Sequence, residues 1–382
     1  MDIFLAGMLA HGPLRDVVLG RRFAGRSAEV AGYEVAQAAG PWSVIVAGDE
    51  ALTGEVLDGL DAAEVARLDF FLTVLGAERR QVAAEIAGQT RQVWLYASTL
   101  ARATWDQTDW LARFGATWVV TAAAVMALRG AMPADRIAAR LVPMLVWGAS
   151  AVRAVDAAPT VLRHRAVPDD VKVAEMRQPY AKFFALQEYD VAWRRFDGGM
   201  SETVTRAAFV SGDAVTVLPY DPARDRVLVV EQFRAGPWAR GDAQSWQIEA
   251  IAGRIDPGET PEQAARREAV EEAGLRLDRL VEVGRYYPSP GAVSEYLYSY
   301  VALTDLPDGS AGVFGEADEA EDIRGHLISF DRLMDLVASR EIENAPLILT
   351  ALWLQRERSR LRVGIGGEVG SASGRDGPIG PS

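Results

Sequence analysis

The sequence predicts an α+β protein made of more than one folded domain. Its 382 residues exceed what one hydrophobic core usually holds. A composition of 49% hydrophobic and 24% charged residues is ordinary for a globular protein. Short apolar runs with strand-like alternation occupy residues 1–98 and recur from Phe184 onward, whereas helical spacing dominates between them. Strands and helices are therefore expected in both halves of the chain.

The first predicted domain is a small α+β unit over residues 1–98, with the strand-like runs DIFLAGML, WSVIVAG and RQVWLYA and a helix around Asp61 to Leu75. Residues 99–170 follow as a helical connector and linker, in which prolines and charges finally replace the apolar periodicity. The second domain is expected over 171–362. The tail, 363–382, is expected to be disordered, because glycine, serine and proline bury too little apolar area to offset the entropy of ordering.

Charge and residue usage exclude several classes of function. The formal net charge of −13 argues against nucleic acid as a partner, since binding to a phosphate backbone needs a basic surface. The absence of cysteine excludes disulfides, thiolate metal sites and a cysteine nucleophile. The N-terminal MDIFLAGML lacks a basic region before its apolar core, and later apolar runs are shorter than a membrane span. We therefore expect a cytoplasmic protein with neither nucleic acid nor membrane as a partner.

The clearest local pattern is an acidic helix over about Pro261 to Ala273, which begins at a capping box and a proline and ends at a glycine. Glu268, Glu271 and Glu272 sit at i, i+3 and i+4, so their carboxylates share one face. Clustered oxygen ligands of this kind suit Mg²⁺ or Mn²⁺, which commonly bridge carboxylates to substrate phosphates. The alternative for such a helix, considered alone, is a solvated acidic face paired with neighbouring arginines.

The residues around this helix favour the metal-binding interpretation. The segment GRIDPGETPEQAARREAVEEAGL, residues 253–275, resembles the Nudix box. That box fixes a glycine, a glutamate after five residues, Arg-Glu after seven more, then Glu-Glu, glycine and an apolar residue. The resemblance implies a Nudix α/β/α sandwich with a mixed sheet. It also implies a hydrolase that uses Mg²⁺ (or Mn²⁺) to cleave a small-molecule nucleoside diphosphate derivative.

Segments around the box resemble the ADP-ribose pyrophosphatase branch of this family. Arg206 in MSETVTRAAF and Arg234 in VVEQFR match arginines that grip substrate phosphate, and a planar guanidinium can pair with two phosphate oxygens at once. Glu249 in WQIEAIAG matches a contact to the adenosine or ribose. Glu295 follows YPSPG and matches a residue that can serve the partner's site in a homodimer. The resemblance therefore implies hydrolysis of ADP-ribose to AMP and ribose 5-phosphate by a homodimer.

The resemblance also implies how catalysis is divided among residues. Positions that match metal ligands are the Ala252 carbonyl, Glu268, Glu272 and Glu321. Glu319 matches the general base, and Glu271 matches either a ligand or a support for the other carboxylates. Bound cations would stabilise the leaving phosphate and lower the pKa of a bound water, whose proton Glu319 would accept.

Residues 1–98 resemble the gamma-glutamylcyclotransferase-like fold. The Tyr-Gly-x-Leu loop of that fold corresponds here to Ala6 through Leu9, and Leu72 stands where the family has its catalytic glutamate. An aliphatic side chain transfers no proton, so we expect docking or dimer stabilisation from this domain and no cyclotransferase activity. The combination of the two domains resembles tellurite-resistance-associated Nudix proteins, a label that names a phenotype and no chemistry.

Two alternatives to ADP-ribose hydrolysis stay open at this point. One is hydrolysis of another nucleoside diphosphate derivative such as a nucleotide sugar. The other is a non-hydrolytic ADP-ribose sensor, which typically loses carboxylates of the box, whereas all of them are present here. The sequence leaves the physiological substrate, the metal preference and any link to stress resistance undecided.

Overall fold

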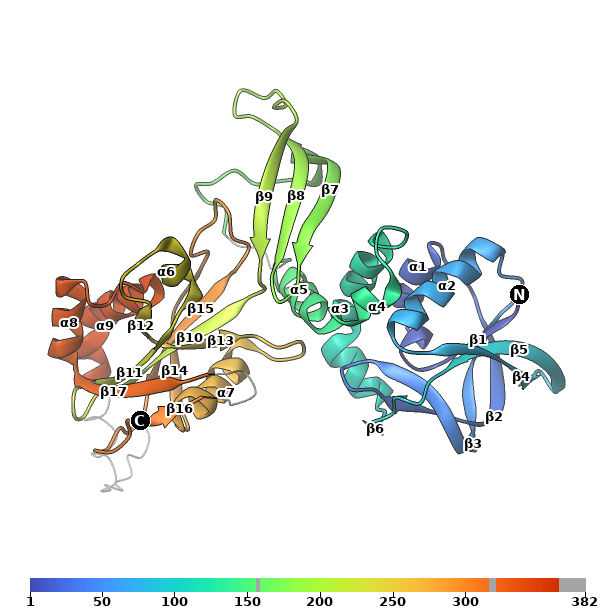
Figure 1. Cartoon of the computed structure of the whole chain (residues 1–382), viewed down its shortest axis with the longest axis horizontal. Coiled ribbons are helices and arrows are strands. Elements are labelled where there is room, and N and C mark those ends of the chain that lie inside the picture. The colour runs from blue at the N-terminus through green and yellow to red at the C-terminus, as the bar shows by residue number, and fades with distance from the viewer. Residues whose placement is uncertain (156–158, 316–320, 364–382) are drawn as a thin grey trace, which may run out of the picture. The chain divides into compact units, whose positions relative to one another are not determined.

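A computed structural model of the chain describes residues 1–155, 159–315 and 321–363. Contacts divide it into two compact units (Figure 1). The N-terminal unit comprises Met1–Gly212 together with Asp256–Glu259 and Ser289–Ser294. The C-terminal unit holds the remaining residues from Asp213 onward. The domain boundaries expected at 98, 170 and 362 stay predictions, and the expected tail, 363–382, lies outside the described residues except for Val363, the last residue of a helix.

A six-stranded sheet forms the centre of the N-terminal unit, in the order β1-β3-β5-β4-β2-β6. Its strands are β1 (Ile3–Leu5), β2 (Arg26–Gln37), β3 (Ser43–Leu57), β4 (Glu78–Ile86), β5 (Gln89–Ala97) and β6 (Ala103–Thr104). A short 3-10 helix, η1 (Gly7–Ala10), and the helices α1 (Gly12–Leu19) and α2 (Ala62–Val74) pack on it. The predicted helix near residue 61 is confirmed: α2 begins at a capping box in which Asp61 and Glu64 bond each other's backbone. The resemblance of this unit to the cyclotransferase-like fold stays a prediction.

Three further helices belong to the N-terminal unit: α3 (Gln107–Ala127), α4 (Ala134–Ala138) and α5 (Leu141–Arg153). The indole N–H groups of Trp110 and Trp118 both donate to the carbonyl of Pro41, at 2.9 and 2.6 Å, which fastens α3 to the turn between β2 and β3. Among the described residues α3 alone is long and apolar enough to cross a membrane, and 44% of that stretch is buried in the protein. Trp118, fully buried, is part of the core of this unit.

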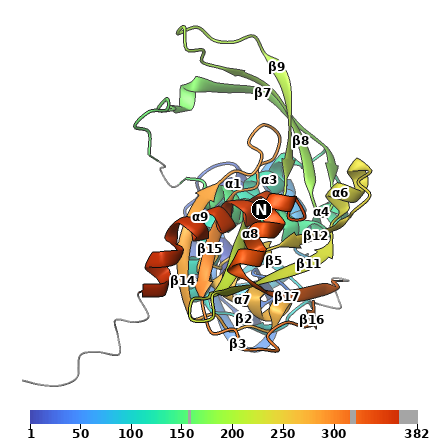
Figure 2. The same ribbon diagram turned by 90° about the vertical axis from the view of Figure 1, so that its left-hand side faces the viewer.

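A separate three-stranded antiparallel sheet consists of β7 (Val171–Ala181), β8 (Ala185–Trp193) and β9 (Val204–Val210) (Figure 2). It is grouped with the N-terminal unit by its contacts. Several of its large apolar side chains are exposed, namely Val171, Val173, Met176, Tyr180 and Phe209. Arg206 lies on β9.

An eight-stranded mixed sheet forms the centre of the C-terminal unit. Its strands are β10 (Ala214–Asp221), β11 (Arg226–Phe233), β12 (Trp246–Glu249), β13 (Ile251–Arg254), β14 (Arg279–Tyr286), β15 (Leu297–Leu303), β16 (Val313–Phe314) and β17 (Ile323–Ser329). The path is β14-β15-β10-β11-β17-β16, with β12 beside β11 and β13 beside β10. Only the β10–β15 pair is parallel among the described strands of this sheet. The predicted α+β class and mixed sheet are confirmed.

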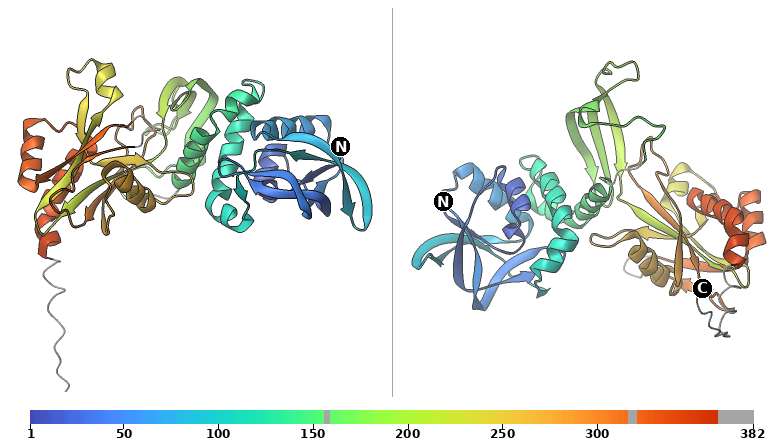
Figure 3. Two further views of the ribbon diagram at one scale, coloured as in Figure 1. Left: turned by 60° about the horizontal axis from the view of Figure 1, so that its bottom comes forward. Right: turned by 180° about the vertical axis from the view of Figure 1, so that it is seen from behind.

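Helices cover both faces of this sheet (Figures 1 and 3). Helix α7 (Pro261–Ala273) packs on one face through buried alanines, in a core that includes Leu228 and Val230 of β11. Helices α8 (Phe330–Ser339) and α9 (Ala345–Val363) pack on the other face, against Val227 and Val229. Side chains alternate along a strand, so odd residues of β11 face α8 and α9 while even ones face α7. This alternation determines which side chains meet the acidic helix.

Candidate active site

The acidic helix lies where the sequence places it and begins and ends as predicted. Thr260 accepts from the backbone N–H of Gln263 in a capping box, and Gly274 ends the helix in the left-handed region at φ 62°. Ala265, Ala269 and Ala273 are buried along one stripe. Small side chains there let α7 approach the sheet closely, which brings its carboxylates against β13.

Gly253 on β13 is the point of closest approach between this strand and α7. A Cβ atom at this position would lie 1.8 Å from Oε1 of Glu268, a distance no real contact allows. The glycine that begins the box therefore makes room for the Glu268 carboxylate beside the strand. Any larger residue would displace either the carboxylate or the backbone that carries Ala252.

Glu272 is the most deeply buried carboxylate of the helix, with 2% of its surface exposed. It follows the alanine stripe at helical spacing, so the same phase that buries the alanines buries Glu272. The backbone N–H of Ala252 donates to its Oε2 at 3.0 Å, and Nε2 of Gln232 on β11 approaches its Oε1 at 3.4 Å. Burial raises the pKa of Glu272 to about 8, against the lowering effect of the Ala252 hydrogen bond. The solvated-face alternative is wrong for this residue.

Glu268 and Glu271 are held by a single arginine. Nη1 of Arg267 donates to Oε1 of Glu268 at 2.7 Å and to Oε2 of Glu271 at 2.8 Å, while its Nη2 donates to the carbonyl of Arg254 at 2.9 Å. Burial raises the pKa of Glu268 to about 7, although Arg267 opposes the shift. Arg267 therefore orients two carboxylates and ties them to the end of β13.

An ion pair lies next to the acidic helix. Arg234, directly after β11, donates to Oε2 of Glu249 through Nη2 at 2.6 Å and through Nε at 3.0 Å, and Glu249 is 6% exposed. Burial alone would lower the pKa of Arg234, but the hydrogen bond and charge of Glu249 raise it, assisted by the charges of Glu272 and Glu321. The guanidinium is thus fixed close to the carboxylates of α7.

Comparison with known proteins identifies this arrangement. Residues 210–349 match the model of the NUDIX domain. The ADP-ribose pyrophosphatase of Escherichia coli (strain K12) is 38% identical over 194 residues, which cover 51% of this chain and 92% of that protein. The chain belongs to the Nudix family. The resemblance inferred from the box is confirmed, and the C-terminal half is a Nudix hydrolase.

Other relatives of this Nudix hydrolase differ in the activity they are named for. The ADP-ribose pyrophosphatase of Haemophilus influenzae is 31% identical over 195 residues, 50% of this chain and 89% of that protein. A GDP-mannose pyrophosphatase of Salmonella paratyphi B is 32% identical over 150 residues, 39% of this chain and 77% of that protein. The crystal structure of an ADP compounds hydrolase aligns with a TM-score of 0.39 and 19% identity, over 51% of this chain and 98% of that chain.

Nudix hydrolases generally use divalent metal ions, and the residues present fit such an ion. Burial raises the pKa values of Glu272 and of the partly buried Glu268, and a divalent cation would favour the ionised form of both carboxylates. Within the described residues no three His, Asp or Glu side chains converge into a complete metal cluster. The candidate ligand set instead combines Glu268 and Glu272 with a main-chain carbonyl, that of Ala252.

The remaining candidate residues of the Nudix hydrolase are distributed more widely. Glu321 lies near enough for its charge to act on Glu268 and Arg234. Burial raises the pKa of Glu295, and the charge of Arg254 opposes this. Glu319 lies outside the described residues. Arg206 belongs to the N-terminal unit, where its guanidinium sits 5.4 Å from the ring centre of Trp193.

Gln232 was absent from the predicted site, although it contacts Glu272 from β11. It is 6% exposed, and its amide is aimed at the carboxylate. A signal for it exists in the sequence: Gln232 stands two residues before Arg234 in VVEQFR, and side chains two apart on a strand share a face.

Proposed function

We propose that the protein hydrolyses the diphosphate bond of ADP-ribose in a Mg²⁺-dependent reaction that yields AMP and ribose 5-phosphate. The observation that carries this proposal is a pair of carboxylates, the partly buried Glu268 and the buried Glu272, held against β13 beside the Arg234–Glu249 ion pair. The relatives support it, because the chain covers 92% of the length of an ADP-ribose pyrophosphatase at 38% identity.

The metal would be held by the Ala252 carbonyl, Glu268 and Glu272, and Glu321, which does not converge with them in this structure, would join them as a further ligand. Bound there, Mg²⁺ (or Mn²⁺) supplies Lewis-acid stabilisation of the diphosphate and a water of lowered pKa. Gln232 and the Ala252 N–H hold Glu272 in one orientation, and Arg267 does the same for Glu268. Neighbouring hydrogen bonds of this kind fix the orientation of the carboxylates that would bind the metal. Glu271 acts through Arg267 in this scheme and supports Glu268.

Substrate recognition falls to the charged groups around these carboxylates. Arg234 would pair with a phosphate of the substrate, exchanging part of its contact with Glu249. Glu249 would then accept from a hydroxyl of the ribose. Glu319 would accept the proton of the attacking water. Arg206 and Glu295 would complete the contacts in a homodimer, the assembly we propose for the chain.

Paired variants of α7 test the assignment of the carboxylates. Glu268→Gln and Glu272→Gln remove one negative charge each while keeping shape, and we expect each to reduce kcat on ADP-ribose by about 100-fold or more. Glu262→Gln makes the same substitution in the first turn of the same helix, at an exposed residue that contacts Tyr300, and should keep wild-type turnover. Unchanged turnover in Glu268→Gln, with saturating Mg²⁺, would refute the metal assignment.

A second candidate is hydrolysis of a nucleotide sugar, favoured by the relative named for GDP-mannose. ADP-ribose and GDP-mannose both present a diphosphate to the same carboxylates. Selectivity between them therefore depends on the protein groups that contact the base and the sugar at either end of the diphosphate. The ratio of kcat/KM for ADP-ribose to that for GDP-mannose decides between them. A ratio below one would transfer the proposal to the sugar nucleotide. Binding of ADP-ribose without any turnover would instead identify a sensor.

A further inference from the structure

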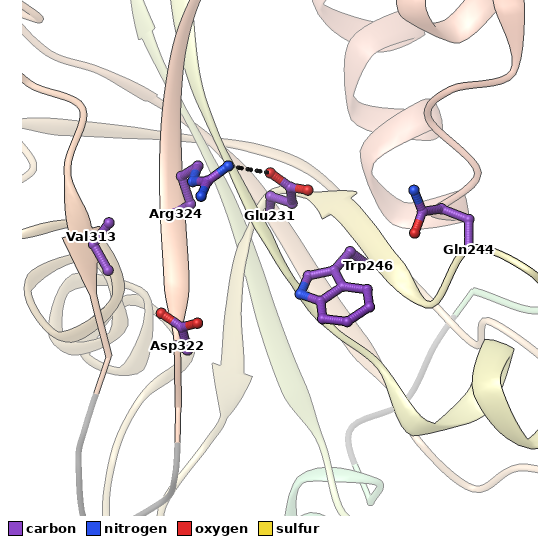
Figure 4. A pocket seen from close by; sticks show the side chains of 6 residues that line it. All are labelled: Glu231, Gln244, Trp246, Val313, Asp322 and Arg324. Atoms are coloured by element: carbon purple, nitrogen blue, oxygen red, sulfur yellow. Dashed lines mark ion pairs between the residues drawn. The ribbon is translucent and has the colours of Figure 1, made fainter.

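A cleft lies in the C-terminal unit, on the sheet face opposite to α7 (Figure 4). Its volume is about 240 Å³. The residues that line it come from β11, β12, β16, β17 and the loops next to them: Glu231, Gln244, Trp246, Val313, Asp322 and Arg324. No role in the proposed hydrolysis falls on any of them.

The register of the sheet separates this cleft from the catalytic carboxylates. Glu231 precedes Gln232 on β11, and adjacent side chains of a strand point to opposite faces. On β17 Arg324 stands opposite Glu231, while Ile323 packs in the core under α7. Asp322 likewise follows Glu321, whose charge acts on the catalytic side. The cleft therefore lies directly behind the active site and is distinct from it.

One carboxylate that lines the cleft, that of Glu231, already has two basic side chains beside it. Oε2 of Glu231 is 2.8 Å from Nε2 of His326 and 3.9 Å from Nη1 of Arg324. The second contact is too long for a hydrogen bond, so it leaves the guanidinium N–H groups of Arg324 available. Figure 4 shows Arg324 and Asp322 on one side of the cleft and the indole of Trp246 on the other.

The walls carry hydrogen-bonding groups that have no side-chain partner among the described residues. Asp322 is an exposed carboxylate without a hydrogen bond or an ion pair there. The side-chain amide of Gln244 also makes no hydrogen bond within that part of the chain. Trp246 is 53% exposed, and its ring meets Phe233 edge-on, with 5.6 Å between ring centroids. An acceptor, several donors and an aromatic surface thus face the same small space.

We propose that this cleft binds a purine base. A purine edge presents N–H donors beside an acceptor, which complements a carboxylate, Asp322, next to a guanidinium, Arg324. A planar base can also stack on the exposed indole of Trp246. The volume is below the roughly 300–1,000 Å³ of sites for larger ligands, so it suits a base and not a whole dinucleotide. The two carboxylates, Glu231 and Asp322, disfavour a phosphate as the recognised group.

Calorimetric titration of the full-length protein with adenosine, guanosine and cytidine tests the proposal. We expect at least one purine nucleoside to bind more tightly than about 1 mM, and cytidine to bind about tenfold more weakly. Asp322→Ala and Trp246→Leu should each weaken purine binding about tenfold or more. Trp238→Leu, a change at another exposed tryptophan of the same unit that does not line the cleft, should leave binding unchanged.

Comparison among these variants separates the cleft from the active site, because nucleoside bound at the catalytic face would appear equally in all of them. Equal purine binding by wild type, Asp322→Ala and Trp246→Leu would overturn the proposal. The proposal would also be overturned if neither adenosine nor guanosine bound, or if cytidine bound more tightly than both. Should Trp246→Leu lose its fold, Asp322→Ala alone decides, since Asp322 is exposed and holds no partner among the described residues.

Discussion

Replacing Glu272 with glutamine should make the metal-free protein more stable at alkaline pH while it lowers kcat about 100-fold or more. The pKa of Glu272 is about 8 in the folded protein, against 4.5 for an ordinary glutamate. Because the folded pKa is raised, the protonated carboxyl contributes stability that is fully present below about pH 4.5 and is lost as the pH rises through about 8. The difference of about 3.5 units corresponds to roughly 5 kcal/mol at most, at about 1.36 kcal/mol per unit.

Only the part of this loss between the chosen pH values is measured. Between about pH 6 and 8.5 the wild-type protein in EDTA should lose about 2 to 3 kcal/mol of unfolding free energy more than Glu272→Gln, since glutamine carries no charge there and can still accept from the Ala252 N–H. Urea unfolding of both proteins at the two pH values gives the difference. Glu262→Gln should behave as wild type.

Mg²⁺ provides the complementary half of this experiment. At about pH 8.5 it should restore stability to wild type, because an ion that binds only the folded state stabilises it, and it should restore much less to Glu272→Gln. Equal pH-dependent losses in wild type and Glu272→Gln would show that burial of the ionised Glu272 carboxylate costs no stability and that it is not held for a cation.

Three further substitutions test separate parts of the structure. Gly253→Ala places a Cβ atom where the Glu268 carboxylate lies, so kcat in steady-state kinetics should fall about 100-fold. The N-terminal unit should keep its stability in unfolding experiments. Unchanged kinetics would contradict the prediction by showing that β13 shifts without displacing Glu268. Arg267→Lys keeps the charge but loses the planar fork that bridges Glu268, Glu271 and the Arg254 carbonyl. The apparent Mg²⁺ affinity in activity titrations should therefore drop about 10- to 100-fold. An unaltered affinity would contradict the positioning role of Arg267. Trp110→Phe removes one of the two N–H donors to the Pro41 carbonyl and should lower the free energy of unfolding in denaturant by about 1 kcal/mol. Hydrolysis should be unaffected. A loss of hydrolysis would contradict the assignment of Trp110 to the fold of the N-terminal unit.

The acidic helix could be predicted closely because its information is local. Caps, the alanine stripe and the glutamate spacing all lie within residues 260–274, and the structure confirms the bounds of α7. The box resemblance then gave the family, since its residues are fixed in type and spacing. The α+β class followed from short strand-like apolar runs, which mark strands buried on one face or on both faces of a sheet.

Long-range pairings could not be predicted in the same way. The Arg234–Glu249 ion pair depends on the register between β11 and β12, which sets Val230 opposite Glu249. Both residues were predicted to meet substrate, and nothing local indicates that they meet each other. Gln232 was missed for the same reason, because its partner lies 40 residues away on α7. Glu272 is buried more deeply than Glu271 because of the rotation of α7 about its axis against the sheet, and this rotation depends on contacts with distant strands.

Product analysis of ADP-ribose incubated with the purified protein shows whether the Nudix site hydrolyses this substrate. With Mg²⁺ we predict stoichiometric release of AMP and ribose 5-phosphate, lost in EDTA and in Glu268→Gln and retained in Glu262→Gln. Intact ADP-ribose after prolonged incubation with Mg²⁺, at enzyme concentrations that turn over another nucleoside diphosphate derivative, would show that ADP-ribose is not the substrate.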